Sequence, residues 1–168
     1  MKRAFSLLAL AAATVLTIAT IASCGDDSST NVVTGSVSGT VTFQGTWPST
    51  GHVQVSIFSN LSPPDYAPGG PPDGFTTPIA PNSTTYAYRI AGLDPGHYSA
   101  IYVGWRDAAN PSGAVMIGVY WMYADSLGVV QSGPKVVPKT PGPAPIHLAE
   151  PSLNPDSLDI VADLDLTP

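Results

Sequence analysis

Short runs of alternating apolar and polar residues, set between proline-rich stretches, restrict this chain to an all-β architecture. Residues 35–44 place Val37, Val41 and Phe43 on one parity, with serine and threonine on the other. This period of two predicts a strand with one face on a core. Six further runs give strand signals: residues 52–59, 84–93, 97–106, 114–123, 146–148 and 157–166. Because no run is convincingly helical, we expect an antiparallel seven-stranded β-sandwich.

Two long proline-rich loops interrupt these strands. Residues 61–83 hold seven prolines, and a second proline-rich stretch follows residue 123 and extends to about Pro145. Proline removes a backbone donor, so neither stretch suits a sheet interior. The runs 97–106 and 114–123 carry apolar residues on both parities, although a sandwich sheet normally buries one face. We therefore expect either the proline-rich loops or a partner to cover their outer face.

The first thirty residues predict export and lipid anchoring. A basic start, an apolar stretch over residues 4–22 and small residues before a cleavage site are typical of a bacterial signal peptide. The segment Ile21-Ala22-Ser23-Cys24 resembles the lipobox of bacterial lipoproteins. That resemblance implies cleavage before Cys24 and acylation of Cys24, and two or three acyl chains anchor stably where one does not. A plain signal peptide or an uncleaved anchor with a chance cysteine is the alternative.

The single cysteine favours lipidation, because exported proteins usually pair their cysteines or lack them. The expected organisation is a signal peptide over residues 1–23, a flexible tether over residues 24–34 and a β-sandwich domain over residues 35–168. The expected location is the bacterial cell envelope, with Cys24 attached to a membrane, the outer membrane in a Gram-negative cell.

The charge balance excludes several classes of partner. The chain has six basic and twelve acidic residues, and two of the basic ones, Lys2 and Arg3, lie in the expected signal peptide. The four that remain are Arg89, Arg106, Lys135 and Lys139. Such a chain is poorly suited to bind nucleic acid or to attach to anionic lipid through basic residues.

Three segments, residues 35–43, 53–57 and 88–98, share a further pattern, and the last runs through Gly92-Leu93 and Pro95-Gly96 into Tyr98. With these segments, residues 35–105 resemble the carboxypeptidase regulatory-like domains of bacterial surface proteins. The resemblance implies a transthyretin-like, carbohydrate-binding-like sandwich and, by analogy, an accessory or glycan-associated role without catalysis. It weakens after Asp107.

Sequence motifs for catalysis or metal binding are scarce, and we expect no enzyme activity, cofactor or metal. Ser132-Gly-Pro-Lys135 matches the SxxK string of some hydrolases, but its proline and glycine disfavour the required helix. His52, His97 and His147 are far apart in sequence, so we expect surface or packing roles unless folding joins two of them. Three aspartates share one face of the last expected strand: Asp159, Asp163 and Asp165. We expect a solvated face that protects an edge strand, with a calcium site as the alternative.

The aromatic residues provide the candidate binding site. Trp47 follows the first expected strand in a turn, while Trp105 and Trp121 lie near strand ends. Exposed aromatic faces near loops can stack on sugar rings, and the alternative is that these rings pack under the loops. The expected function is therefore a lipid-anchored binding or display module for a ligand such as polysaccharide. A structural or assembly subunit of an envelope protein complex is the alternative.

Overall fold

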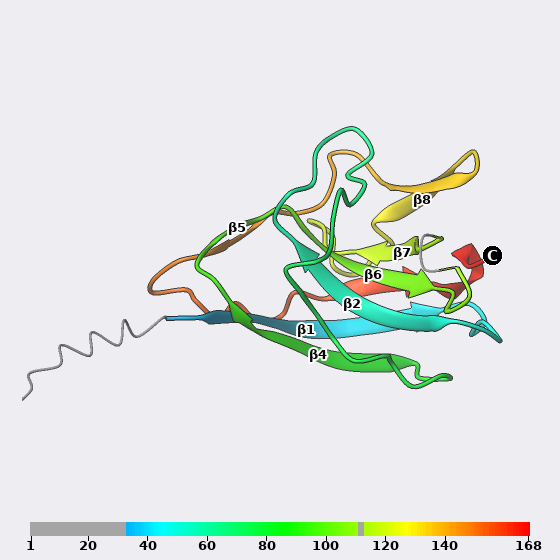
Figure 1. Cartoon of the computed structure of the whole chain (residues 1–168), viewed down its shortest axis with the longest axis horizontal. Coiled ribbons are helices and arrows are strands. Elements are labelled where there is room, and N and C mark those ends of the chain that lie inside the picture. Colours follow the sequence, from blue (N-terminus) through cyan, green and yellow to red (C-terminus); the bar gives the residue numbers. More distant parts are fainter. Residues whose placement is uncertain (1–32, 111–112) are drawn as a thin grey trace, which may run out of the picture. The chain divides into compact units, whose positions relative to one another are not determined.

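Seven strands pair into one sheet in the order β3–β2–β6–β7–β11–β1–β4 (Figure 1). The structure is a computed structural model that describes residues 33–110 and 113–168. The sheet strands are β1 (Gly35–Gln44), β2 (His52–Phe58), β3 (Gly74–Phe75), β4 (Thr85–Leu93), β6 (Ala100–Arg106), β7 (Val115–Val119) and β11 (Ile160–Asp163). All neighbouring strands are antiparallel except β1 and β11, which are parallel. The expected signal peptide, Cys24 and most of the expected tether lie outside the described residues.

Two small ladders and one helical turn complete the described part of the chain. The ladders are β5 (Gly96–Tyr98) with β10 (Ile146–Leu148), and β8 (Val129–Ser132) with β9 (Lys135–Pro138). The turn of 3₁₀ helix is η1 (Leu164–Leu166). Within residues 33–110 and 113–168, no helix has the length and apolar character needed to cross a membrane.

The main sheet curls until its two edges approach each other, which makes it partly barrel-like. Gly74 of edge strand β3 lies so close to edge strand β4 that an added Cβ would come within 2.6 Å of the Ile90 side chain. Figure 1 shows β2, β6 and β7 facing β1 and β4 across the interior. The inner face buries the core that the alternation predicted, including Val37, Val55 and Ile160.

The all-β class and the number of strands in the main sheet agree with the sequence prediction, but several boundaries differ. Residues 97–106 divide at Ser99, because β5 pairs with β10 whereas β6 pairs with β2. The expected second loop contains the β8–β9 hairpin. Its two-residue turn is Gly133-Pro134, with Gly133 at φ +61 as a type II′ turn requires. The SxxK string is therefore a hairpin turn and not the start of a helix.

The expectation that the last strand is an edge strand was wrong. Strand β11 lies between β7 and β1, in the interior of the sheet. The aspartates in and beside β11 accept hydrogen bonds from β1 and the turn after it: Thr40 N to Asp159 Oδ1 (2.7 Å), Gln44 Nε2 to Asp163 Oδ2 (3.1 Å) and Thr46 N to Asp165 Oδ1 (2.9 Å). In the part of the chain that the structure describes, no group of three or more His, Cys, Asp or Glu side chains could hold a metal ion.

The backbone of the segment before β11 packs directly against β1 at Gly39. We therefore predict that this position tolerates no side chain. A Cβ on Gly39 would overlap the backbone oxygen of Leu158 and come within 2.6 Å of its carbonyl carbon. We expect Gly39→Ala to lower the free energy of unfolding by about 1–3 kcal/mol, as overpacking does. Urea denaturation measures this. Gly96→Ala is the matched control, because a Cβ at Gly96 meets no atom within 4 Å. Equal stability of both variants would contradict the close packing.

Candidate functional site

The outer face of β6 and β7 is apolar and carries a second cluster of buried side chains. Its members are Phe58, Leu61, Ala100, Tyr102, Val119, Trp121 and Val129. The residues come from the sheet, from the segments after β2 and β7, and from the β8–β9 hairpin. The sequence analysis expected either the proline-rich loops or a partner to cover this outer face. In the structure, the chain's own proline-rich segments lie on it.

A buried hydrogen bond fixes the first covering segment to the sheet. The Tyr102 hydroxyl on β6 donates to the Tyr66 carbonyl oxygen over 2.8 Å. Tyr102 is only 3 % exposed, and burial is the main cause that raises the pKa of its hydroxyl well above the usual range. The hydroxyl therefore stays protonated and remains a donor over the whole physiological range.

The two covering segments also contact each other. The Tyr66 ring rests against Gly142, which is buried and has φ +110, and a Cβ there would come within 2.6 Å of the Tyr66 hydroxyl oxygen. Lys135 Nζ lies 3.5 Å from Asp65 Oδ2, with side chains 70 % and 48 % exposed. An ion pair this exposed adds little stability. The tyrosine–glycine contact is therefore the main link between the segments.

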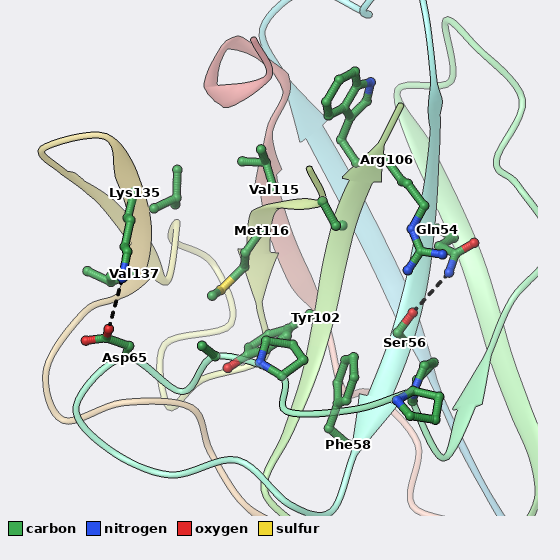
Figure 2. Close-up of a pocket in the computed structure, with 18 of the residues that line it drawn as sticks. Gln54, Ser56, Phe58, Asp65, Tyr102, Arg106, Val115, Met116, Lys135 and Val137 are labelled. Carbon is green, nitrogen blue, oxygen red and sulfur yellow. Dashed lines mark hydrogen bonds and ion pairs between the residues drawn. The ribbon is translucent and has the colours of Figure 1, made fainter. Parts of the chain in front are cut away.

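A groove with a volume of about 490 Å³ remains between the two covers and the sheet. Its lining comes from β2, β6 and β7, from residues 65–72 and from residues 134–137. Figure 2 shows Phe58, Tyr102, Met116 and Val115 along the groove, with Arg106 at one end and the Lys135–Asp65 pair at the other. The groove thus has a mostly apolar lining with polar groups at both ends, as small-molecule sites commonly do.

The Arg106 end of the groove holds an unsatisfied donor. Arg106 Nε is buried and has no hydrogen-bond partner among the described residues. Gln54 and Ser56 lie beside it on β2, and the Gln54 amide nitrogen contacts the Ser56 hydroxyl at 3.4 Å (Figure 2). Leaving a buried donor of a charged group unpaired costs more than about 1–3 kcal/mol. Arg106 itself lines the groove, so the rest of its guanidinium is available to an anionic group of a ligand there.

The groove also contains basic side chains, which are rare in this acidic chain. Arg106 and Lys135 are two of the four basic residues that follow Cys24, and both line the groove. Asp65 is the one acidic residue among the lining residues, and it is paired with Lys135. The Arg106 charge is thus left without a counter-ion in the groove, which favours an anion there.

The three tryptophans expected to form a platform do not share a face. Trp105 and Trp121 are 5 % and 8 % exposed and lie in different clusters. Their indole N–H groups donate to the carbonyl oxygens of Thr50 (2.9 Å) and Ser126 (3.0 Å). Trp47 is partly buried, donates to the Ser83 carbonyl oxygen over 3.0 Å and borders a smaller pocket of about 250 Å³. Trp105 alone of the three also lines the groove.

Sequence reasoning did not single out Arg106, Gln54 or Ser56. Two signals point to them. Gln54 and Ser56 share the outward parity of their strand, and Arg106 is one of very few basic residues in the expected domain. What brings them together is the antiparallel register of β2 and β6, which pairs Gln54 with Gly104 and His52 with Arg106.

Loss of the Tyr102 hydroxyl should loosen the cover of the groove. We expect Tyr102→Phe to lower the free energy of unfolding by about 1–3 kcal/mol, because the Tyr66 carbonyl loses its buried donor. Amide hydrogen exchange in residues 61–72 should also become faster. Tyr86→Phe is the matched control, since the Tyr86 hydroxyl makes no hydrogen bond within the described residues. Unchanged exchange in residues 61–72 would show that this bond does not hold the cover.

Comparison with known proteins gives no relative from which a function can be carried over. No protein-family model matches the chain, and no curated protein or solved structure matches it. The resemblance of residues 35–105 to carboxypeptidase regulatory-like domains therefore stays a prediction. The groove and its side chains are the basis for assigning a function.

Proposed function

We propose that this chain is a lipid-anchored, non-enzymatic binding protein of the bacterial cell envelope, and that its ligand occupies the groove between the sheet and its two covers. The observation that carries the proposal is Arg106, which lines one end of an apolar groove and forms no ion pair with a described residue. A guanidinium presents donors in a planar fork that suits a carboxylate or phosphate. The ligand class is therefore a small organic anion with an apolar body.

The size and lining of the groove support a small ligand. Its volume of about 490 Å³ lies in the range of about 300–1,000 Å³ typical of small-molecule pockets. Phe58, Tyr102 and Met116 provide apolar contact along its length, and Met adapts its shape easily to an irregular ligand. An apolar body along this floor would place its acidic group beside Arg106 and Gln54.

The titratable groups of the groove support binding rather than catalysis. Asp65 and Lys135 face each other in an exposed ion pair, and Tyr102 is committed to the Tyr66 carbonyl oxygen. Arg106 is permanently charged and is a poor proton donor or acceptor. This set offers anion recognition but no nucleophile with an adjacent base.

The ligand proposed here differs from the polysaccharide expected from the tryptophans. That expectation required exposed indole faces, whereas Trp105 and Trp121 are buried with their N–H groups bonded. The assembly alternative draws on large apolar side chains at the surface: Phe75, Met122, Tyr123 and Val130 are 45–62 % exposed. A charged, unpartnered group in a defined groove is the more specific signal, so ligand binding is the first candidate.

Decanoate is a simple probe of the proposed site, and we expect it to bind through Arg106. Titrating decanoate below its micelle concentration into ¹⁵N-labelled residues 26–168 should shift the amide signals of Gln54, Tyr102 and Arg106. Decanol should bind about tenfold or more weakly, because one charge-assisted hydrogen bond contributes about 1.5–3 kcal/mol. Arg106→Gln should remove this difference between the acid and the alcohol.

Arg89→Gln is the matched control for that experiment. It removes the same charge from an exposed position on β4, away from the groove. It should leave decanoate binding unchanged. If Arg106→Gln and Arg89→Gln lose decanoate binding equally, the effect is one of general charge. Decyltrimethylammonium is a cation with the same alkyl chain, and if it binds as tightly as decanoate, anion recognition is contradicted. If neither decanoate nor decanol binds, cross-linking in the intact envelope tests the assembly alternative.

Anchoring through Cys24 is the second part of the proposal and has its own test. We expect the mature protein to begin at Cys24 and to carry acyl chains, which mass spectrometry of the N-terminal peptide would detect. Cys24→Ala should yield unacylated protein that leaves the membrane fraction. An unmodified Cys24 in the mature wild-type protein would contradict lipidation and leave the groove proposal intact.

A further inference from the structure

Folding brings together two histidines that are far apart in the sequence. His97 lies on β5 and His147 on β10, and they face each other directly in the antiparallel ladder. Their rings are parallel, with an interplanar angle of 1° and centroids 4.0 Å apart. The sequence analysis left open whether folding could join two histidines, and it joins these two.

Both imidazoles are available to a ligand from solvent. His97 and His147 are exposed, and neither ring forms a hydrogen bond or an ion pair with any described residue. The neighbouring side chains on the two strands point the other way. Tyr98, Ile146 and Leu148 are 5 %, 4 % and 0 % exposed and belong to the inner core. His147 thus lies between two buried residues and His97 next to one, and these residues hold the backbone that carries the two rings.

We propose that His97 and His147 form a two-imidazole site for a divalent transition-metal ion, with Cu²⁺ bound most strongly. Imidazole nitrogen is a preferred ligand of Cu²⁺, Ni²⁺ and Zn²⁺, and Cu²⁺ leads the affinity order of the first-row ions. Metal–imidazole bonds measure about 2.0–2.1 Å, so two of them span up to about 4 Å. The two rings are stacked with centroids 4.0 Å apart, so each must turn about its side-chain bonds to direct a nitrogen at a shared ion.

The site would be open, with only these two protein ligands. No third His, Cys, Asp or Glu completes a metal-binding group within residues 33–110 and 113–168. Water fills the remaining positions of the ion. Bound metal would link β5 to β10, which are otherwise joined by a ladder of three residue pairs. This site lies outside the groove lining, so it is independent of the ligand proposed there.

A Cu²⁺ titration of the purified, untagged mature protein tests the site. Electron paramagnetic resonance should show one ion per chain with splitting from two imidazole nitrogens. His97→Gln and His147→Gln should each lose one nitrogen from the spectrum and weaken Cu²⁺ binding at least tenfold. His52→Gln is the matched control and should keep both the affinity and the spectrum, because His52 lies on β2.

A second readout separates metal binding from any effect on folding. Because the ion binds the folded ladder, Cu²⁺ should raise the melting temperature of the wild type and of His52→Gln, but not that of the other two variants. Without metal, all four proteins should melt at similar temperatures, since His97 and His147 are exposed. Wild-type affinity in either His97→Gln or His147→Gln would overturn the proposal. So would a wild-type spectrum with no more than one imidazole nitrogen.

Discussion

Burial of both faces of β6 is the constraint on which the candidate site depends. Ile101 and Val103 point into the inner core, while Ala100 and Tyr102 point to the outer face, and all four are buried. A strand of this kind cannot remain at the surface of a sheet, because its outer face would expose a large apolar area. The proline-rich segment after β2 and the β8–β9 hairpin cover that face. The groove is the space that these two covers leave over β2, β6 and β7.

The covers are held by side-chain packing and by separate hydrogen bonds to the sheet and its connections. Examples are Tyr102 Oη to the Tyr66 carbonyl, Asp73 N to the Ile57 carbonyl and Ala144 N to the Tyr120 carbonyl. Proline in the first cover restricts its backbone, which lowers the conformational entropy lost when this segment folds. The rigid part of the site is β6 with its neighbours, which carry Arg106 and Gln54. In the proposed binding mode, the groups that recognise the ligand lie on the sheet.

The sequence predicted the strands better than it predicted the site. Alternation over residues 35–44 and 52–59 located β1 and β2 closely, since one face of each is buried in the core. The β8–β9 hairpin was missed because it lies among prolines, and its turn depends on the left-handed conformation of Gly133. For the tryptophans the sequence left two possibilities, an exposed platform or rings packed under the loops, and Trp105 and Trp121 are packed with their indole N–H groups bonded inside the fold. Arg106 and the His97–His147 pair depend on strand register, which sequence alone does not supply.

The position of β11 has a consequence for the order in which the chain can fold. Thr40 and Asp159 are joined by a hydrogen bond although they are 119 positions apart, so the centre of the sheet includes almost the last residues of the chain. Contacts of such long range form slowly. During synthesis from the N-terminus, β7 and β1 each keep one unpaired edge until β11 has been made and pairs with both. Unpaired edges invite association with other chains, so a product that ends before β11 would be prone to aggregation and proteolysis.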